Sequence, residues 1–190
     1  MYYHASQVSD IKILEPRISN HNIPLIYFST KRENVLVYLS NAIEKHCKEM
    51  GFVHNGKWHK WASYGFEPDG TLRLDEYYPN AIEDTYKGVS GYIYSADVVI
   101  ENQDNINISN AVTTSHPVTV TDIEFIKDAY SEILKAAESG SIIIRRYEDM
   151  SDKMIAWIEN TIKREYAEVV EEPDYKYFLK AKFKFLENED

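Results

Sequence analysis

A histidine and two tyrosines near the start of the chain are the residues whose types and spacing could do chemistry. His4 lies in a predicted first strand, Tyr27 in a predicted second strand, and Tyr38 in the helix expected to follow. Tyr38 falls at the edge of that helix's apolar face, so one side of its ring can pack on the core while the other borders a cleft. The pattern indicates a cleft lined by ring faces and by polar tips that exchange hydrogen bonds.

Signatures of other chemistries do not occur in the sequence. The seven glycines form no phosphate-binding loop, and there is no nucleophile elbow, kinase motif or zinc signature. His54 and His59 flank a predicted hairpin turn without a cysteine or a placed carboxylate, so we expect surface histidines and no metal site. The single cysteine, Cys47, lies on an apolar helix face, where we expect a buried small hydrophobic residue.

Two consecutive elements must position the tyrosines. An apolar strand over 25–28 leads into an amphipathic helix over 32–48, and Thr30 with Glu33 has the spacing of a capping box at the helix start. Gly51 is expected to end the helix in a left-handed conformation. Helical spacing places seven residues on the inward face: Val35, Leu36, Leu39, Ala42, Ile43, His46 and Cys47.

The rest of the chain reads as short strands mixed irregularly with helices. Strands are predicted over 2–5, 13–14, 89–100, 108–114, 118–126 and 141–147, with a hairpin at Asn55–Gly56 and a turn over 68–70. Helices are predicted over 79–86, 128–138, from Ser151 to before Pro173, and over 174–186, where strand-like alternation competes. This order indicates an α+β fold with a mainly antiparallel sheet. Without a linker composition, we expect one domain over 1–190.

Composition limits the partners. The formal net charge is −10, with 31 acidic against 21 basic residues, which argues against nucleic acid as a partner. No apolar run is long enough to cross a bilayer, and the first residues lack a signal-peptide pattern. We therefore expect a cytoplasmic protein with no membrane partner.

The His4–Ala5–Ser6 tripeptide and the Ile26–Ser29 strand resemble motifs of the ADP-ribosyltransferase family, in its diphtheria-toxin-like and poly-ADP-ribose-polymerase-like branch. That branch carries a strand-borne histidine and two tyrosines eleven residues apart, which here match His4, Tyr27 and Tyr38. The resemblance covers 1–135 and implies an NAD site at His4, Ser6, Tyr27, Ser29 and Tyr38. It implies that the histidine binds ribose hydroxyls and that the tyrosines sandwich the cationic nicotinamide ring.

The chain departs from the family at a third element, a glutamate on a later strand that helps the nicotinamide bond to ionise. In the strand predicted after residue 108, the matching position holds Asn110 or Ala111, and an amide supplies no negative charge to a developing cation. Glu101 is the other candidate, if the strands are aligned differently. The resemblance therefore implies weak or absent ADP-ribosyl transfer.

Two functions remain open from the sequence. The first is an intracellular protein of ADP-ribosyltransferase-like fold that binds NAD or a related nucleotide. The second is a non-catalytic interaction domain that meets a protein partner through Trp58 and Trp61 on the predicted hairpin and through an acidic surface.

Overall fold

The chain forms two compact units, each described here by itself. The computed structural model describes residues 1–18, 23–54, 63–97, 99 and 108–187. Unit 1 comprises Met1–Leu39, Gly65–Arg73 and Tyr86–Ile143, and unit 2 comprises Ser40–Tyr64, Leu74–Thr85 and Ile144–Asp190. The division does not decide whether the units unfold together, so a single domain stays a prediction.

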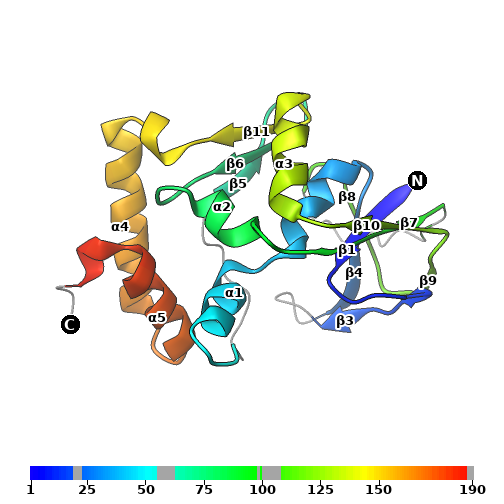
Figure 1. The fold of residues 1–190 in the computed structure, drawn as a ribbon, viewed down its shortest axis with the longest axis horizontal. Helices are drawn as coiled ribbons and strands as arrows, with labels where there is room; N and C mark the ends of the chain where they lie inside the picture. Colours follow the sequence, from blue (N-terminus) through cyan, green and yellow to red (C-terminus); the bar gives the residue numbers. More distant parts are fainter. Residues whose placement is uncertain (19–22, 55–62, 98, 100–107, 188–190) are drawn as a thin grey trace. The chain divides into compact units, whose positions relative to one another are not determined.

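Unit 1 is built on an antiparallel sheet in the order β10-β7-β1-β4-β3, with β8 also paired to β4 (Figure 1). A short ribbon, β2-β9, accompanies it. The strands are β1 (Tyr2–Ser6), β2 (Ile13–Leu14), β3 (Arg17–Ile18), β4 (Pro24–Ser29), β7 (Gly91–Ala96), β8 (Ala111–Thr114), β9 (Val118–Thr119) and β10 (Asp122–Ile126). The 3-10 helix η1 (Arg32–Leu39) and helix α3 (Ala129–Glu138) pack together, and η1 also contacts β1.

Alternate side chains along the strands of unit 1 point to the same side and pack into a hydrophobic core. Ile26 and Phe28 point inward from β4, two positions apart, as successive same-face residues of a strand must. They join Tyr94 and Ala96 of β7, while Tyr2 of β1 packs against the cluster from its edge. Gly91 lets β7 pass close to its neighbours, since a Cβ there would lie 2.6 Å from the Leu39 side chain.

Unit 2 is mainly helical (Figure 1). Its helices are α1 (Ala42–Glu49), α2 (Ala81–Tyr86), α4 (Asp152–Glu168) and α5 (Pro173–Lys182), with 3-10 turns η2 (Tyr147–Asp149) and η3 (Lys184–Leu186). Helix α5 packs on both α1 and α4 and buries Tyr175, Phe178 and Leu179. The strands β5 (Ser63–Phe66), β6 (Leu72–Asp75) and β11 (Ile142–Arg145) form a further sheet in the order β11-β6-β5, and each of them has residues assigned to both units.

A fully buried carboxylate, Glu76, links two segments of unit 2 by hydrogen bonds. Its side chain accepts hydrogen bonds from the Arg146 guanidinium at 3.1 Å and from the Ile82 backbone N–H at 3.1 Å. Both partners compensate part of the cost of removing a charge from water. The interaction therefore fixes the first turn of α2 to the segment that follows β11.

The predicted α+β class with antiparallel sheets is confirmed, as are several element ends. Ser151 caps α4, and Gly51 has φ 88° after α1. The helix expected over 128–138 forms over Ala129–Glu138, with Asp128 as its cap. The segment after Pro173 is helical, as expected. Among the described residues, no helix combines the length and the apolar composition needed to span a membrane.

The prediction of one continuous helix over 32–48 was wrong. The chain forms η1 over Arg32–Leu39, breaks at Ser40, and starts α1 at Ala42. Asn41 is the cap of the new helix, because its side-chain oxygen accepts from the Ile43 N–H at 3.0 Å. All seven residues expected on the inward face are nevertheless buried. The spacing of apolar residues identified the buried side chains but could not detect the break. An asparagine inside a helix and an asparagine at a helix cap look the same in the sequence.

Three further predicted strands differ from those that the structure shows. The strand over 118–126 is two strands, β9 and β10, and the strand over 89–100 is shorter, at Gly91–Ala96. The strand over 141–147 was expected to be buried, but Ile142 is its one buried residue within β11. The predicted turn at Asn55–Gly56 lies outside the described residues, as do His59, Trp58 and Trp61.

The two candidate caps can be compared directly. Asn41→Ala should lower the free energy of unfolding by about 1 kcal/mol, because it removes the acceptor for the Ile43 N–H. Thr30→Ala should have a smaller effect, since the Thr30 hydroxyl makes only a 3.5 Å contact with the Asn110 carbonyl. Urea unfolding followed by circular dichroism measures both. A larger loss for Thr30→Ala would restore the predicted capping box.

Candidate functional site

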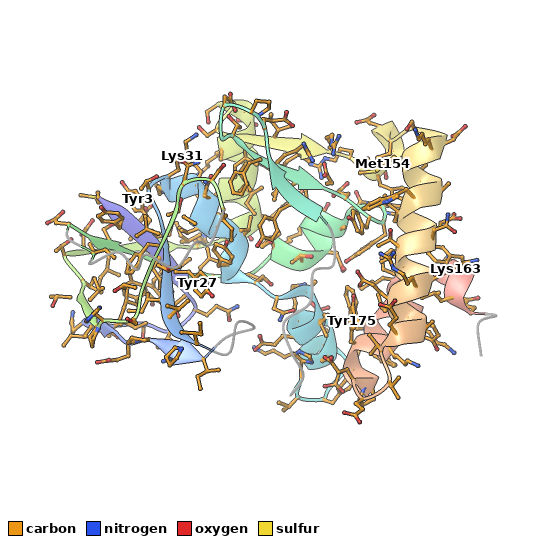
Figure 2. All side chains as sticks on the ribbon, turned by 180° about the vertical axis from the view of Figure 1, so that it is seen from behind. Tyr3, Tyr27, Lys31, Met154, Lys163 and Tyr175 are labelled. Atoms are coloured by element: carbon orange, nitrogen blue, oxygen red, sulfur yellow. The ribbon has the colours of Figure 1, made fainter. Side chains whose placement is uncertain are left out.

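A hollow opens in unit 1 where strands β1 and β4 separate. The two strands pair at Tyr3 opposite Ser29. Further along, the His4 side chain reaches across instead, and its Nδ1 lies 2.9 Å from the Tyr27 carbonyl oxygen. The hollow beside this bridge has a volume of about 260 Å³. Figure 2 labels Tyr3 and Tyr27, which lie on the two strands that separate.

The walls of the hollow come from three segments: β1, the stretch from Ile11 to Arg17 that includes β2, and β4. The lining residues are His4, Ser6, Ile11, Ile13, Leu14, Glu15, Arg17, Leu25, Ile26 and Tyr27. Half of them are aliphatic and half carry a polar group, so the hollow offers both an apolar surface and hydrogen-bonding groups to a small molecule.

His4 is held in one tautomer. Burial lowers the pKa of its imidazole, which outweighs the opposing effect of the Tyr27 carbonyl, and the nearby Arg17 charge lowers the pKa further. The ring is therefore neutral at pH 7. Because the carbonyl can only accept, Nδ1 carries the proton, and Nε2 is left as an acceptor. His4 can thus receive a hydrogen bond from a ligand hydroxyl.

Three further polar groups line the hollow. The Ser6 hydroxyl oxygen accepts from the Val8 N–H at 3.1 Å, so its own proton can be donated elsewhere. Arg17 and Glu15 are exposed at the rim. Together with His4, these groups offer a neutral acceptor, a hydroxyl, a cation and an anion around an aliphatic surface.

The three predicted rings do not share one cleft. The His4 ring packs against Phe28, with centroids 5.9 Å apart, on the face of β4 that also carries Ile26. Tyr27 lies between Ile26 and Phe28, so alternation directs its ring to the other face. Tyr38, the residue before the last of η1, has 45% of its surface exposed and is not among the residues that line the hollow. Of the expected trio, the structure joins His4 to Tyr27 through the Tyr27 backbone.

Ser6 and Ser29, the two serines of the predicted site, have different positions. Ser6 lines the hollow. Ser29 is buried, does not line the hollow, and accepts a hydrogen bond from the Lys31 N–H at 3.0 Å. Its contact is therefore with the turn that follows β4.

Asn110, one candidate for the catalytic position, is a turn residue. It precedes β8 with φ 61°, and its amide donates to the Gly70 carbonyl at 3.0 Å. Its own carbonyl accepts from the Thr30 N–H at 2.9 Å. These bonds hold the turn together, and Asn110 does not line the hollow. Ala111 opens β8, and Glu101 lies outside the described residues.

Sequence reasoning did not identify Arg17, Glu15 or the aliphatic wall. Arg17 follows Pro16 at the edge of a two-residue strand, a context with no pattern that distinguishes a binding residue from ordinary surface.

No protein-family model, curated protein sequence or solved structure matches this chain.

Protonation of His4 should destabilise the fold. Because the pKa of His4 is lower in the folded state than its ordinary 6.5, the unfolded chain takes up protons first as the pH falls below that value. The free energy of unfolding should therefore fall from pH 7 towards pH 5.

His4→Asn separates this effect from other titrations, because an asparagine amide can still donate to the Tyr27 carbonyl but does not titrate. Its pH dependence should be shallower than that of the native chain and should keep the contribution of His46, whose pKa burial also lowers. Urea unfolding at several pH values measures this. Identical slopes would mean that His4 is not held neutral.

Proposed function

We propose that this chain binds a nucleotide in the hollow between β1 and β4, with NAD as the expected ligand. The observation that carries the proposal is the hydrogen bond from His4 Nδ1 to the Tyr27 carbonyl, which leaves Nε2 as the acceptor of a ring that lines a partly apolar hollow. A ribose brings hydroxyl donors to such an acceptor, and Ser6 can donate in return. The resemblance of His4–Ala5–Ser6 to the ADP-ribosyltransferase motif supports the same ligand and an ADP-ribosyltransferase-like fold.

Charge and size restrict how the ligand would bind. The chain is strongly acidic overall, so an anionic ligand needs a local cation, and Arg17 supplies one beside His4. Its planar guanidinium suits a phosphate group. A hollow of about 260 Å³ holds one part of a dinucleotide, since pockets for whole ligands of drug size run from roughly 300 to 1,000 Å³. The remainder of the ligand would lie over the rim.

The proposed mode departs from the family in one respect. A nicotinamide sandwich needs two tyrosine rings facing each other, but Tyr27 lines the hollow and Tyr38 does not. Aliphatic side chains from β4 and from the Ile11–Leu14 stretch would supply the apolar contact instead. The alternative, a partner surface at Trp58 and Trp61, and the cytoplasmic location both stay predictions.

Calorimetric titration with NAD tests the proposal. The native chain should bind, and His4→Asn, which lacks the Nε2 acceptor, should bind about tenfold more weakly, as the loss of one hydrogen bond predicts. Arg17→Gln should weaken binding and reduce its salt dependence, because it removes the rim cation. Lys127→Gln removes an exposed cation of the same unit that does not line the hollow and is the matched control.

Tyr38→Ala distinguishes the hollow from a two-tyrosine site. If the ligand depends on the hollow, this variant should bind NAD as the native chain does, because Tyr38 does not line it. Loss of binding in Tyr38→Ala with full binding in His4→Asn would support the tyrosine sandwich and contradict the present mode. No binding by the native chain at millimolar NAD would refute the nucleotide proposal.

Transfer of ADP-ribose from NAD should be weak or absent. Asn110 is committed to the turn with Gly70, and a placed carboxylate is worth on the order of a hundredfold to a thousandfold in rate at such a centre. Nicotinamide release, measured by chromatography, should stay near background for the native chain. Asn110→Glu should not raise it, because residue 110 does not line the hollow. Robust release by Asn110→Glu would show that the position faces the ligand after all.

A further inference from the structure

A cysteine, a histidine and an aspartate from three segments of unit 2 lie together. Cys47 is on α1, His54 follows the end of that helix, and Asp174 is in the first turn of α5. One ligand-type atom from each residue lies within 4.8 Å of the other two. Among the described residues, these three are the histidine, cysteine and acidic side chains that lie close enough together to hold a metal ion. The expectation that His54 is a surface histidine was wrong, since its side chain is only 5% exposed. Its contact with Asp174 could not be read from the sequence, because Asp174 lies 120 positions beyond His54.

We propose that Cys47, His54 and Asp174 bind a divalent transition-metal ion, with Zn²⁺ as the best match. Thiolate, imidazole and carboxylate are the three ligand types that zinc uses in proteins. Their combined charge is −2 when the imidazole is neutral, so a divalent cation neutralises the site. Mg²⁺ and Ca²⁺ prefer oxygen ligands alone and do not suit a sulfur and a ring nitrogen.

The geometry is close to a tetrahedral site. Zinc–nitrogen and zinc–oxygen bonds of about 2.0–2.2 Å put two such ligands about 3.3–3.6 Å apart on a tetrahedron. His54 Nδ1 and Asp174 Oδ2 are 3.3 Å apart, whereas a charge-assisted hydrogen bond is usually about 2.7–2.9 Å. The thiol sulfur lies within 4.8 Å of both atoms. A tetrahedral zinc ion with a zinc–sulfur bond of about 2.3 Å would put the sulfur about 3.6 Å from them, so binding requires the three side chains to draw closer by up to about 1 Å. Three protein ligands leave the fourth corner for water.

The surroundings favour a fixed site. Cys47 is fully buried, and the His54 side chain is only 5% exposed, while Asp174 at 24% leaves a path from solvent. Tyr175, next to Asp174 and labelled in Figure 2, is buried and donates its hydroxyl proton to Glu165, which anchors the first turn of α5. Helix α5 packs on α1, so the segments that bear Asp174 and Cys47 are held side by side.

A catalytic cysteine is the competing role for such a trio, and the structure disfavours it. A nucleophilic thiolate must reach its substrate, and Cys47 has no exposed surface. Burial, with the Asp174 carboxylate nearby, raises the pKa of the Cys47 thiol, so it stays protonated in the absence of a cation. A bound metal ion changes this balance by its own charge, and the thiol then releases its proton to solvent.

Cobalt substitution is a direct test on the full native chain. Co²⁺ replaces Zn²⁺ in thiolate sites and gives a sulfur-to-metal charge-transfer band. Cys47 is the only cysteine in the sequence, so this band can arise from no other residue. We expect one Co²⁺ per chain with the charge-transfer band, intense visible bands of four-coordinate cobalt, and displacement of both by one equivalent of Zn²⁺. Absence of the band at excess Co²⁺ would overturn the proposal.

Variants separate coordination from folding. Cys47→Ser should lose the charge-transfer band, while His54→Ala and Asp174→Asn should each weaken Zn²⁺ affinity at least tenfold, as loss of a ligand does. His116→Gln removes an exposed histidine of unit 1 and should bind Zn²⁺ normally. Zn²⁺ should also raise the melting temperature of the native chain but not that of Asp174→Asn, whose circular dichroism reports whether it folds. Equal Zn²⁺ binding by all variants would assign the metal to other residues and overturn the proposal.

Discussion

The hydrogen bond between the His4 ring and the Tyr27 carbonyl is the contact on which the proposed site depends. It bridges β1 and β4 where their backbone pairing stops, and it fixes which ring nitrogen keeps the proton. Packing against Phe28 holds the ring in place, and burial keeps it neutral. This bridge between two strands therefore leaves Nε2 as the acceptor of a ring that lines the hollow.

Local rules predicted much of the fold. The inward residues of 32–48 are buried because side-chain spacing alone decides which ones share a face, even though η1 and α1 are separate helical segments. The cap at Ser151 was predictable because its hydroxyl satisfies a backbone donor three residues on, at Met154. The break between Leu39 and Ala42 was not predictable, since an asparagine within a helix and one at a cap look the same in the sequence.

The candidate site was predicted only in part. His4, Ser6 and Tyr27 line the hollow, but Tyr38 does not. Because Ile26 and Phe28 of β4 point into the core, strand alternation places the Tyr27 ring on the other face of β4 from the His4 ring. Asn110 was compared with a catalytic acid by its place in a strand, yet it is a left-handed turn residue bonded to Gly70. Arg17, and the meeting of Cys47 with Asp174, depend on contacts between distant segments that no local pattern encodes.

The tautomer of His4 and its response to a ligand test the central claim most directly. Long-range proton–nitrogen NMR correlation of the histidine rings distinguishes a protonated Nδ1 from a protonated Nε2, and His4→Asn assigns the signal. The account predicts a neutral His4 ring with the proton on Nδ1 at pH 7, and a saturable change in the Nε2 resonance on titration with NAD. A proton on Nε2, or an Nε2 signal unmoved by millimolar NAD, would contradict it.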